Sequence, residues 1–123
     1  MKQEDFDKLV DSIFSDLKKI LSSKAKQYAG DQDRLDQFKR ATVFTNLPAH
    51  RNLAGLMVKH TTSIYDMLQA LNLTDYPISL WEEKIYDHIN YLLLLMGLIE
   101  DAYKDRVICI SEKDIEIPEK VKK

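Results

Sequence analysis

Residues 79–99 read SLWEEKIYDHINYLLLLMGLI, and their last nine residues form the longest apolar run in the chain. Ser79 and Glu82 match a capping box, so this segment predicts a long helix that begins at Ser79 and continues to about Tyr103. One stripe of the first half is apolar, whereas the second half is apolar nearly all round. The second half is therefore expected to be buried on several sides.

An amphipathic helix is also predicted at the start of the chain. Apolar residues recur there at steps of three and four from Phe6 to Leu21 and form one stripe. The helix is expected to end within Lys24–Asp31, because lysines near a last turn and a glycine such as Gly30 are typical of helix C-termini.

Two more helices are predicted between these. The first is short, runs from about Gln32 to Phe44, and is expected to turn four residues inward: Leu35, Phe38, Ala41 and Phe44. Asn46-Leu47-Pro48 breaks the chain. The second then runs to about Leu71, with these residues on one side: Leu53, Leu56, Met57, His60, Ile64, Met67, Leu68 and Leu71.

The composition fits this arrangement. The chain has 123 residues, of which 45% are hydrophobic and 31% charged, and it contains only three glycines and three prolines. Because glycine and proline are typical of turns, so few of them disfavour an all-β fold, which needs many turns. We therefore expect a single domain over residues 1–123, an all-α helical bundle of three long helices and a short one. A short C-terminal strand or arm is expected around residues 107–117.

The charge and the cysteine content exclude several classes of protein. The formal net charge is −2, which gives no general basic field for nucleic acid or an anionic membrane, so we expect no direct DNA binding. Cys109 is the only cysteine, which excludes a disulfide framework and a cysteine-rich metal site. An acidic N-terminus without an apolar h-region, and no apolar run near twenty residues, predict a soluble cytoplasmic protein.

A bundle of this size cannot easily cover every side of residues 91–99 with its own helices. We therefore expect a homodimer that buries this apolar surface.

Two helices carry polar residues at matching spacings. Glu83, Asp87 and Asn90 are spaced i, i+4, i+7 and share one face, where two carboxylates can hold Mg²⁺. Lys59, Ser63 and Asp66 follow the same spacing on the preceding helix. If the two helices are antiparallel neighbours, Asp66 can be a third ligand and Lys59 can meet a phosphate. From spacing alone, a solvated polar face is the favoured interpretation of Glu83, Asp87 and Asn90, and it explains the pattern on the preceding helix at least as well as a ligand site does.

A third group lies between residues 24 and 40. Tyr28, Lys39 and Arg40 combine cations with an aromatic ring, which suits a phosphorylated ligand that has a base to stack on. The alternative is that the aromatic residue caps the bundle and the charges are solvated.

Three segments resemble a known family: KQYAGD with FKRA (26–31 and 38–41), MVKHTTSIYD (57–66) and WEEKIYDHINY (81–91). They are similar to the nucleotide-modification-associated domain of phages and prophages, a distant relative of the all-α, MazG-like nucleoside triphosphate pyrophosphatases. The resemblance covers roughly residues 24–101. It implies an oligomeric helical bundle that binds a nucleotide with magnesium and hydrolyses a nucleoside triphosphate to monophosphate and pyrophosphate.

The resemblance also implies roles for individual residues. These are Asp66, Glu83 and Asp87 as magnesium ligands, Lys59 and Asn90 as catalytic residues, and Tyr28, Lys39 and Arg40 as residues facing the nucleotide.

The chain departs from the pyrophosphatase pattern in its acids. That pattern has Glu-x-x-Glu on one helix and Glu-x-x-Asp on the next. Here Asp66 has no second acid three or four residues away, and Glu83-x-x-x-Asp87 is one residue wider. The departures favour two alternatives to hydrolysis: a member that only binds nucleotide, or a small non-enzymatic phage accessory protein that acts through its apolar surface.

Overall fold

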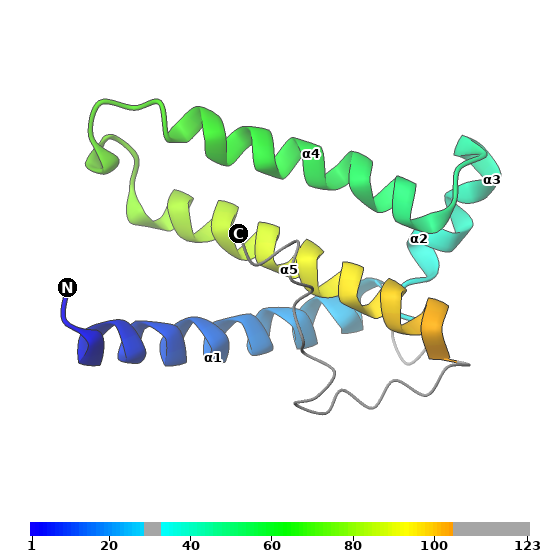
Figure 1. Cartoon of the computed structure of the whole chain (residues 1–123), viewed down its shortest axis with the longest axis horizontal. Coiled ribbons are helices and arrows are strands. Elements are labelled where there is room, and N and C mark those ends of the chain that lie inside the picture. Colours follow the sequence, from blue (N-terminus) through cyan, green and yellow to red (C-terminus); the bar gives the residue numbers. More distant parts are fainter. Residues whose placement is uncertain (29–32, 105–123) are drawn as a thin grey trace, which may run out of the picture.

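The structure is a computed structural model that describes residues 1–28 and 33–104, with side chains described for all of these except residues 25–28. The chain is an all-α helical bundle, as predicted (Figure 1), and the described ranges contain no strand. The elements are α1 (Gln3–Tyr28), α2 (Asp36–Arg40), α3 (Thr42–Thr45), α4 (Ala49–Met67), a 3₁₀ turn (Leu73–Asp75) and α5 (Ile78–Tyr103). Within the described part, no helix is long and apolar enough to span a membrane.

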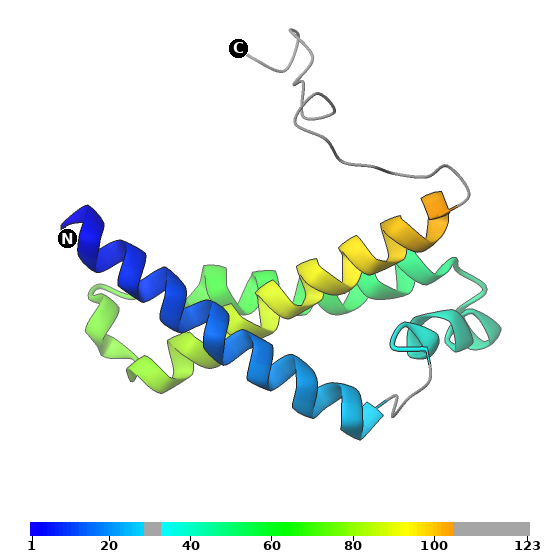
Figure 2. The same cartoon turned by 90° about the horizontal axis from the view of Figure 1, so that it is seen from below.

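Helix α5 is the central element of the bundle. It runs antiparallel to α4 along most of its length, and α1 lies on its other side (Figure 1). Seen from below, α1 crosses α5 at an angle instead of following it (Figure 2). The short helices α2 and α3 pack against the first turns of α4.

The buried core joins α2, α4 and α5 at one end of the bundle. It consists of Leu35, Phe38, Leu53 and Leu94, surrounded by partly buried apolar residues of α4 and α5. The Asn52 side chain of α4 donates a hydrogen bond to the Phe38 carbonyl oxygen at 3.0 Å, which fixes α2 on α4.

Several predicted helix limits are wrong. Helix α5 begins at Ile78 with Pro77 at its N-cap, so Ser79 already lies inside the helix and makes no cap. Proline is favoured at a helix start because its φ is already near −65°. A capping box forms instead seven residues earlier, between Asn72, the N-cap of the 3₁₀ turn, and Asp75 within it. The predicted helix over residues 32–44 is two short helices that meet at Ala41.

Four residues predicted on the inward side of the helices over residues 32–71 are exposed: Phe44, Leu56, Leu68 and Leu71. Phe44 is 90% exposed, because α3 ends at Thr45 and carries it away from α4. Leu71 is 92% exposed, because α4 ends at Met67 and the helical period does not reach residue 71. Gly30 and the predicted C-terminal arm lie outside the described residues.

The second half of α5 is not buried on several sides by the described part of the chain. Leu94 is buried, but four neighbours on other faces of the helix are exposed: Leu92, Leu93, Met96 and Ile99. The expectation of burial on several sides is therefore wrong for the described residues, and the homodimer that was predicted to cover this surface stays a prediction.

Candidate functional site

A group of polar and aromatic side chains surrounds the middle of α5, and we call it the central polar cluster. Its members come from three helices: Lys24 of α1, His60 of α4, and Asp87, Asn90 and Tyr91 of α5. The Lys24 ammonium donates to an Asp87 carboxylate oxygen at 3.2 Å, and both side chains are only partly exposed. This ion pair joins two helices whose residues are 63 positions apart in the sequence.

Asn90 is the most deeply buried polar residue in the cluster. It is 5% exposed, and its side-chain oxygen has no hydrogen-bond partner among the described residues. Such an oxygen costs about 1–3 kcal/mol of folding free energy, the desolvation that no partner offsets. His88 Nδ1 and Arg34 Nη1 are also buried without a partner in the described ranges, but neither residue is itself as deeply buried. Asn90 is therefore a hydrogen-bond acceptor that the described part of the chain leaves unused.

The His60 ring packs against Tyr91. The ring centroids lie 4.8 Å apart at an interplanar angle of 34°, within the range of favourable aromatic contacts. Burial lowers the pKa of His60 below its ordinary value of 6.5, and the negative charge of Asp87 opposes this shift. His60 is therefore mostly neutral at pH 7 and offers one donor and one acceptor.

We expect the protein to lose stability as the pH is lowered, partly because of His60. Its pKa is lower in the folded than in the unfolded chain, so the unfolded chain binds the proton first and stability is lost as the pH falls from about 6.5 through the lower folded value. Melting temperatures measured from pH 7.5 to 5.5 should fall less steeply for His60→Gln than for the wild type. His50→Gln, an exposed position at the start of α4, should keep the wild-type slope, and equal slopes for all three proteins would contradict the prediction.

The acids of the predicted metal site are not gathered into one site. Glu83 lies one turn before Asp87 on α5 and is exposed, and Asp66 is exposed on α4. Among the described residues, no three His, Cys, Asp or Glu side chains are placed to hold a metal ion. Lys59 is also exposed on α4. The predicted acids therefore build no closed magnesium site by themselves.

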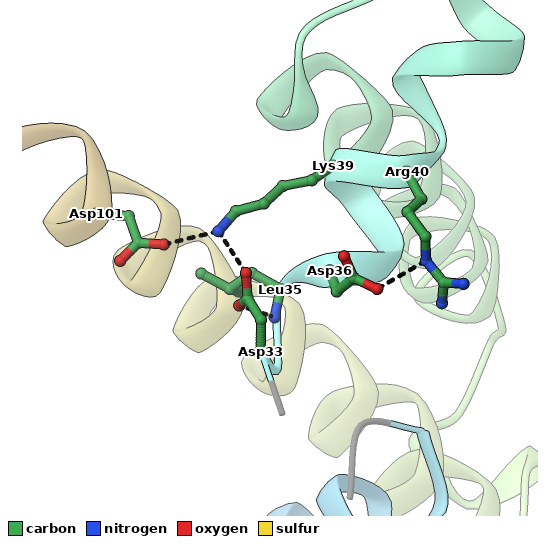
Figure 3. Close-up of polar contacts among 6 residues, drawn as sticks. All are labelled: Asp33, Leu35, Asp36, Lys39, Arg40 and Asp101. Atoms are coloured by element: carbon green, nitrogen blue, oxygen red, sulfur yellow. Dashed lines mark hydrogen bonds and ion pairs between the residues drawn. The ribbon is translucent and has the colours of Figure 1, made fainter. Parts of the chain in front are cut away.

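The predicted nucleotide-facing cations are engaged elsewhere (Figure 3). Lys39 pairs with Asp33 and, at 3.1 Å, with Asp101 near the end of α5, while Arg40 Nε pairs with Asp36 at 2.7 Å. The hydrogen bond from Lys39 holds the pKa of Asp33 below its ordinary value.

These cations lie far from the central polar cluster along α5. Asp101 is fourteen residues beyond Asp87, or about 21 Å along a helix. Lys39 and Arg40 therefore do not join the cluster. The side chain of Tyr28 lies outside the described residues.

Comparison with protein-family models, with curated proteins and with solved structures finds no match. The resemblance to the nucleotide-modification-associated domain therefore stays a prediction.

Sequence reasoning missed the part that Lys24 and His60 play in the cluster. Both lie inside segments that resemble the family or next to them, but no spacing on α1 or α4 points to a partner on α5. Lys24 reaches the cluster because α1 crosses α5, and His60 because α4 packs antiparallel to α5; both are properties of the fold.

Proposed function

We propose that this protein binds a nucleoside phosphate at the central polar cluster. Asn90 supplies a buried acceptor for a donor group of the ligand, and Tyr91 supplies a ring beside which a base can lie. Lys24 is the cation of the cluster that can meet a phosphate. The resemblance of residues 57–66 and 81–91 to a nucleotide-related family points to the same ligand class.

The observation that carries the proposal is the oxygen of Asn90, which has no partner among the described residues. Buried polar groups are nearly always hydrogen-bonded, and a lasting exception calls for an explanation such as a ligand. Asn90 lies three residues after Asp87 on α5, and Asp87 forms the half-buried ion pair with Lys24. A ligand that donates to Asn90 offsets a cost that the protein otherwise carries.

Magnesium fits this proposal only as an ion that arrives with the phosphates. Mg²⁺ keeps several waters and is usually held by one or two carboxylates together with substrate phosphates. Glu83 and Asp87, one turn apart, supply that number of carboxylates, whereas the described part of the chain gathers no third acid with them. We therefore expect Mg²⁺ to strengthen the binding of a nucleotide, with little binding of Mg²⁺ alone.

The test is a melting-temperature titration with a panel of ribo- and deoxyribonucleoside mono-, di- and triphosphates, each with and without Mg²⁺. A true ligand at about a hundred times its Kd stabilises the folded state by about 2.7 kcal/mol. Chromatography of the same mixtures shows whether monophosphate and pyrophosphate are formed. No shift with any nucleotide would overturn the proposal.

Replacing Asn90 with leucine tests the site itself. The side chains are similar in size, and leucine removes the oxygen that lacks a partner among the described residues. Without nucleotide, we expect Asn90→Leu to raise the unfolding free energy by about 1–3 kcal/mol, and with it the melting temperature. We also expect the variant to lose the rise in melting temperature that nucleotide causes in the wild type. Asn52→Leu is the matched control, because it removes a made hydrogen bond and should lower the melting temperature. A lower melting temperature for Asn90→Leu would contradict the assignment.

A second candidate function is binding of a partner protein through an apolar groove. A cavity of about 660 Å³ lies where the 3₁₀ turn meets α5, and its lining includes Leu68, Leu73, Tyr76, Ile78, Trp81 and Ile85. The Trp81 indole donates to the Leu73 carbonyl oxygen at 2.9 Å and meets Tyr76 edge to face. A groove of this kind suits the apolar face of a partner helix. This function becomes the leading candidate if no nucleotide of the panel raises the melting temperature.

A further inference from the structure

Helix α5 carries an apolar stripe along most of its length that the described part of the chain leaves uncovered. The α5 stripe consists of Ile78, Ile85, Leu92, Met96 and Ile99, which are between 38% and 72% exposed. At 3.6 residues per turn they lie within about 60° of one another around the helix, on the side away from the core residue Leu94. An exposed apolar face of this length is uncommon on a monomer and marks an interaction surface.

The residues that follow α5 match this stripe in composition. Residues 107–110 read VICI and residues 115–117 read IEI, with the polar residues SEKD between them. The stripe also has two parts, one from Leu92 to Ile99 and one at Ile78 and Ile85. Since the segment begins at the end of α5, a path back along the helix meets the two parts in the order in which its own apolar residues occur.

The number of residues is sufficient for this path. Ile99 and Ile85 are 14 positions apart, which is about 21 Å along a helix. Val107 and Ile115 are eight positions apart, and an extended chain of that length reaches about 26 Å. Because the segment is joined to α5, its effective concentration at the stripe is on the order of millimolar, as for other short tethers. A segment of the same chain therefore has a large advantage over a free partner.

Charges beside the stripe favour the same direction. Glu82 and Glu100 are exposed and eighteen residues apart, or five full turns, so they lie on one flank of the stripe near its two ends. In a segment that runs antiparallel to α5, Arg106 comes first and lies near Glu100, whereas Lys120 and Lys122 come last and can reach Glu82. Both acids of this flank thus gain a cation.

We propose that residues 107–117 fold back antiparallel along α5 and cover the α5 stripe. Residues 107–110 cover the part from Leu92 to Ile99, and Ile115 and Ile117 cover the part at Ile85. The arm expected from the sequence thereby provides, within one chain, the cover for which a homodimer was expected.

The central polar cluster stays open in this arrangement. Asp87 lies nine residues before Met96, which is half a turn around the helix from it. The segment and the cluster therefore occupy opposite sides of α5, and the proposal does not depend on nucleotide binding.

The test is disulfide formation with Cys109, the only cysteine of the chain. Three variants each place a second thiol on the stripe: Leu92→Cys, Met96→Cys and Ile99→Cys. Val58→Cys is the control, because Val58 is 63% exposed and, two residues before His60, lies level with the same part of α5 but on the far face of α4. The rate of disulfide formation within one chain under mild oxidation is divided by the rate of the same variant in concentrated urea, since the number of residues between the thiols governs the rate in the unfolded chain.

We expect at least one stripe variant to exceed Val58→Cys in this ratio at least about tenfold, because docking holds Cys109 beside the stripe. Adding Val107→Asp to that variant should lower its ratio at least about fivefold, since a charge then lies at the apolar contact. Ser111→Asp is the matched control: it adds the same charge two residues from Cys109 and should leave the ratio within about twofold.

Three results would overturn the proposal. The first is an equal ratio for the stripe variants and Val58→Cys, and the second is an equal effect of Val107→Asp and Ser111→Asp. The third is the formation of dimers linked through the introduced thiols in place of the disulfide within one chain, which would assign the stripe to a second copy.

Discussion

Leu53→Ala should destabilise the protein by about 2–5 kcal/mol, a large part of the stability of a domain of this size. Leu53 has no exposed surface and lies where α2, α4 and α5 meet, in contact with the cluster of Leu35, Phe38 and Leu94. Alanine leaves a cavity there, because helices held by so few buried residues cannot close around it without losing other contacts. Urea unfolding followed by circular dichroism measures the change.

Leu56→Ala is the control, since Leu56 lies on the same helix and is 43% exposed. The same truncation there should cost less than about 1 kcal/mol. Comparable losses for the two variants would mean that Leu56 is buried in solution, by a second copy or by another partner. An unchanged unfolding free energy for Leu53→Ala would contradict the burial of Leu53 in this core.

The long helices could be predicted because their signal is local. Apolar residues at steps of three and four lie within a few turns of each other, and α1, α4 and α5 follow them closely. The predicted ends of the helices were wrong where proline or the end of a helix, and not the apolar pattern, sets the limit. Pro77 and not Ser79 is the N-cap of α5. Helix α4 ends at Met67, so the spacing that predicts Leu71 on its apolar side no longer applies there.

The candidate site was predictable only along α5. Asp87 and Asn90 share a face because of helix geometry, which the spacing alone specifies. Their partners were not predictable, because the ion pair of Asp87 depends on where α1 crosses α5, and Lys24 lies 63 residues away. The same limit applies to Lys39, whose pairing with Asp101 follows from the packing of α2 beside the end of α5.

Asp87→Asn should weaken the binding of a magnesium–nucleotide by at least about 30-fold, which corresponds to about 2 kcal/mol. Asp87 lies one turn after Glu83, and of the three predicted metal ligands it is the one that forms an ion pair within the cluster, with Lys24. Asparagine keeps the shape and removes the charge, and hydrogen bonds to charged groups contribute about 1.5–3 kcal/mol. Isothermal titration calorimetry at fixed Mg²⁺ measures the loss.

The fold should survive this change, because the amide oxygen that Asp87→Asn introduces can still accept a hydrogen bond from the Lys24 ammonium. Circular dichroism should therefore show the wild-type helix content, and Glu100→Gln, an exposed acid on the same helix, should bind nucleotide as the wild type does. If Asp87→Asn binds with unchanged affinity while Asn90→Leu does not bind, the ligand occupies the Asn90 side of the cluster and its phosphates do not reach Asp87. If both variants bind as the wild type does, the nucleotide site lies elsewhere on the chain.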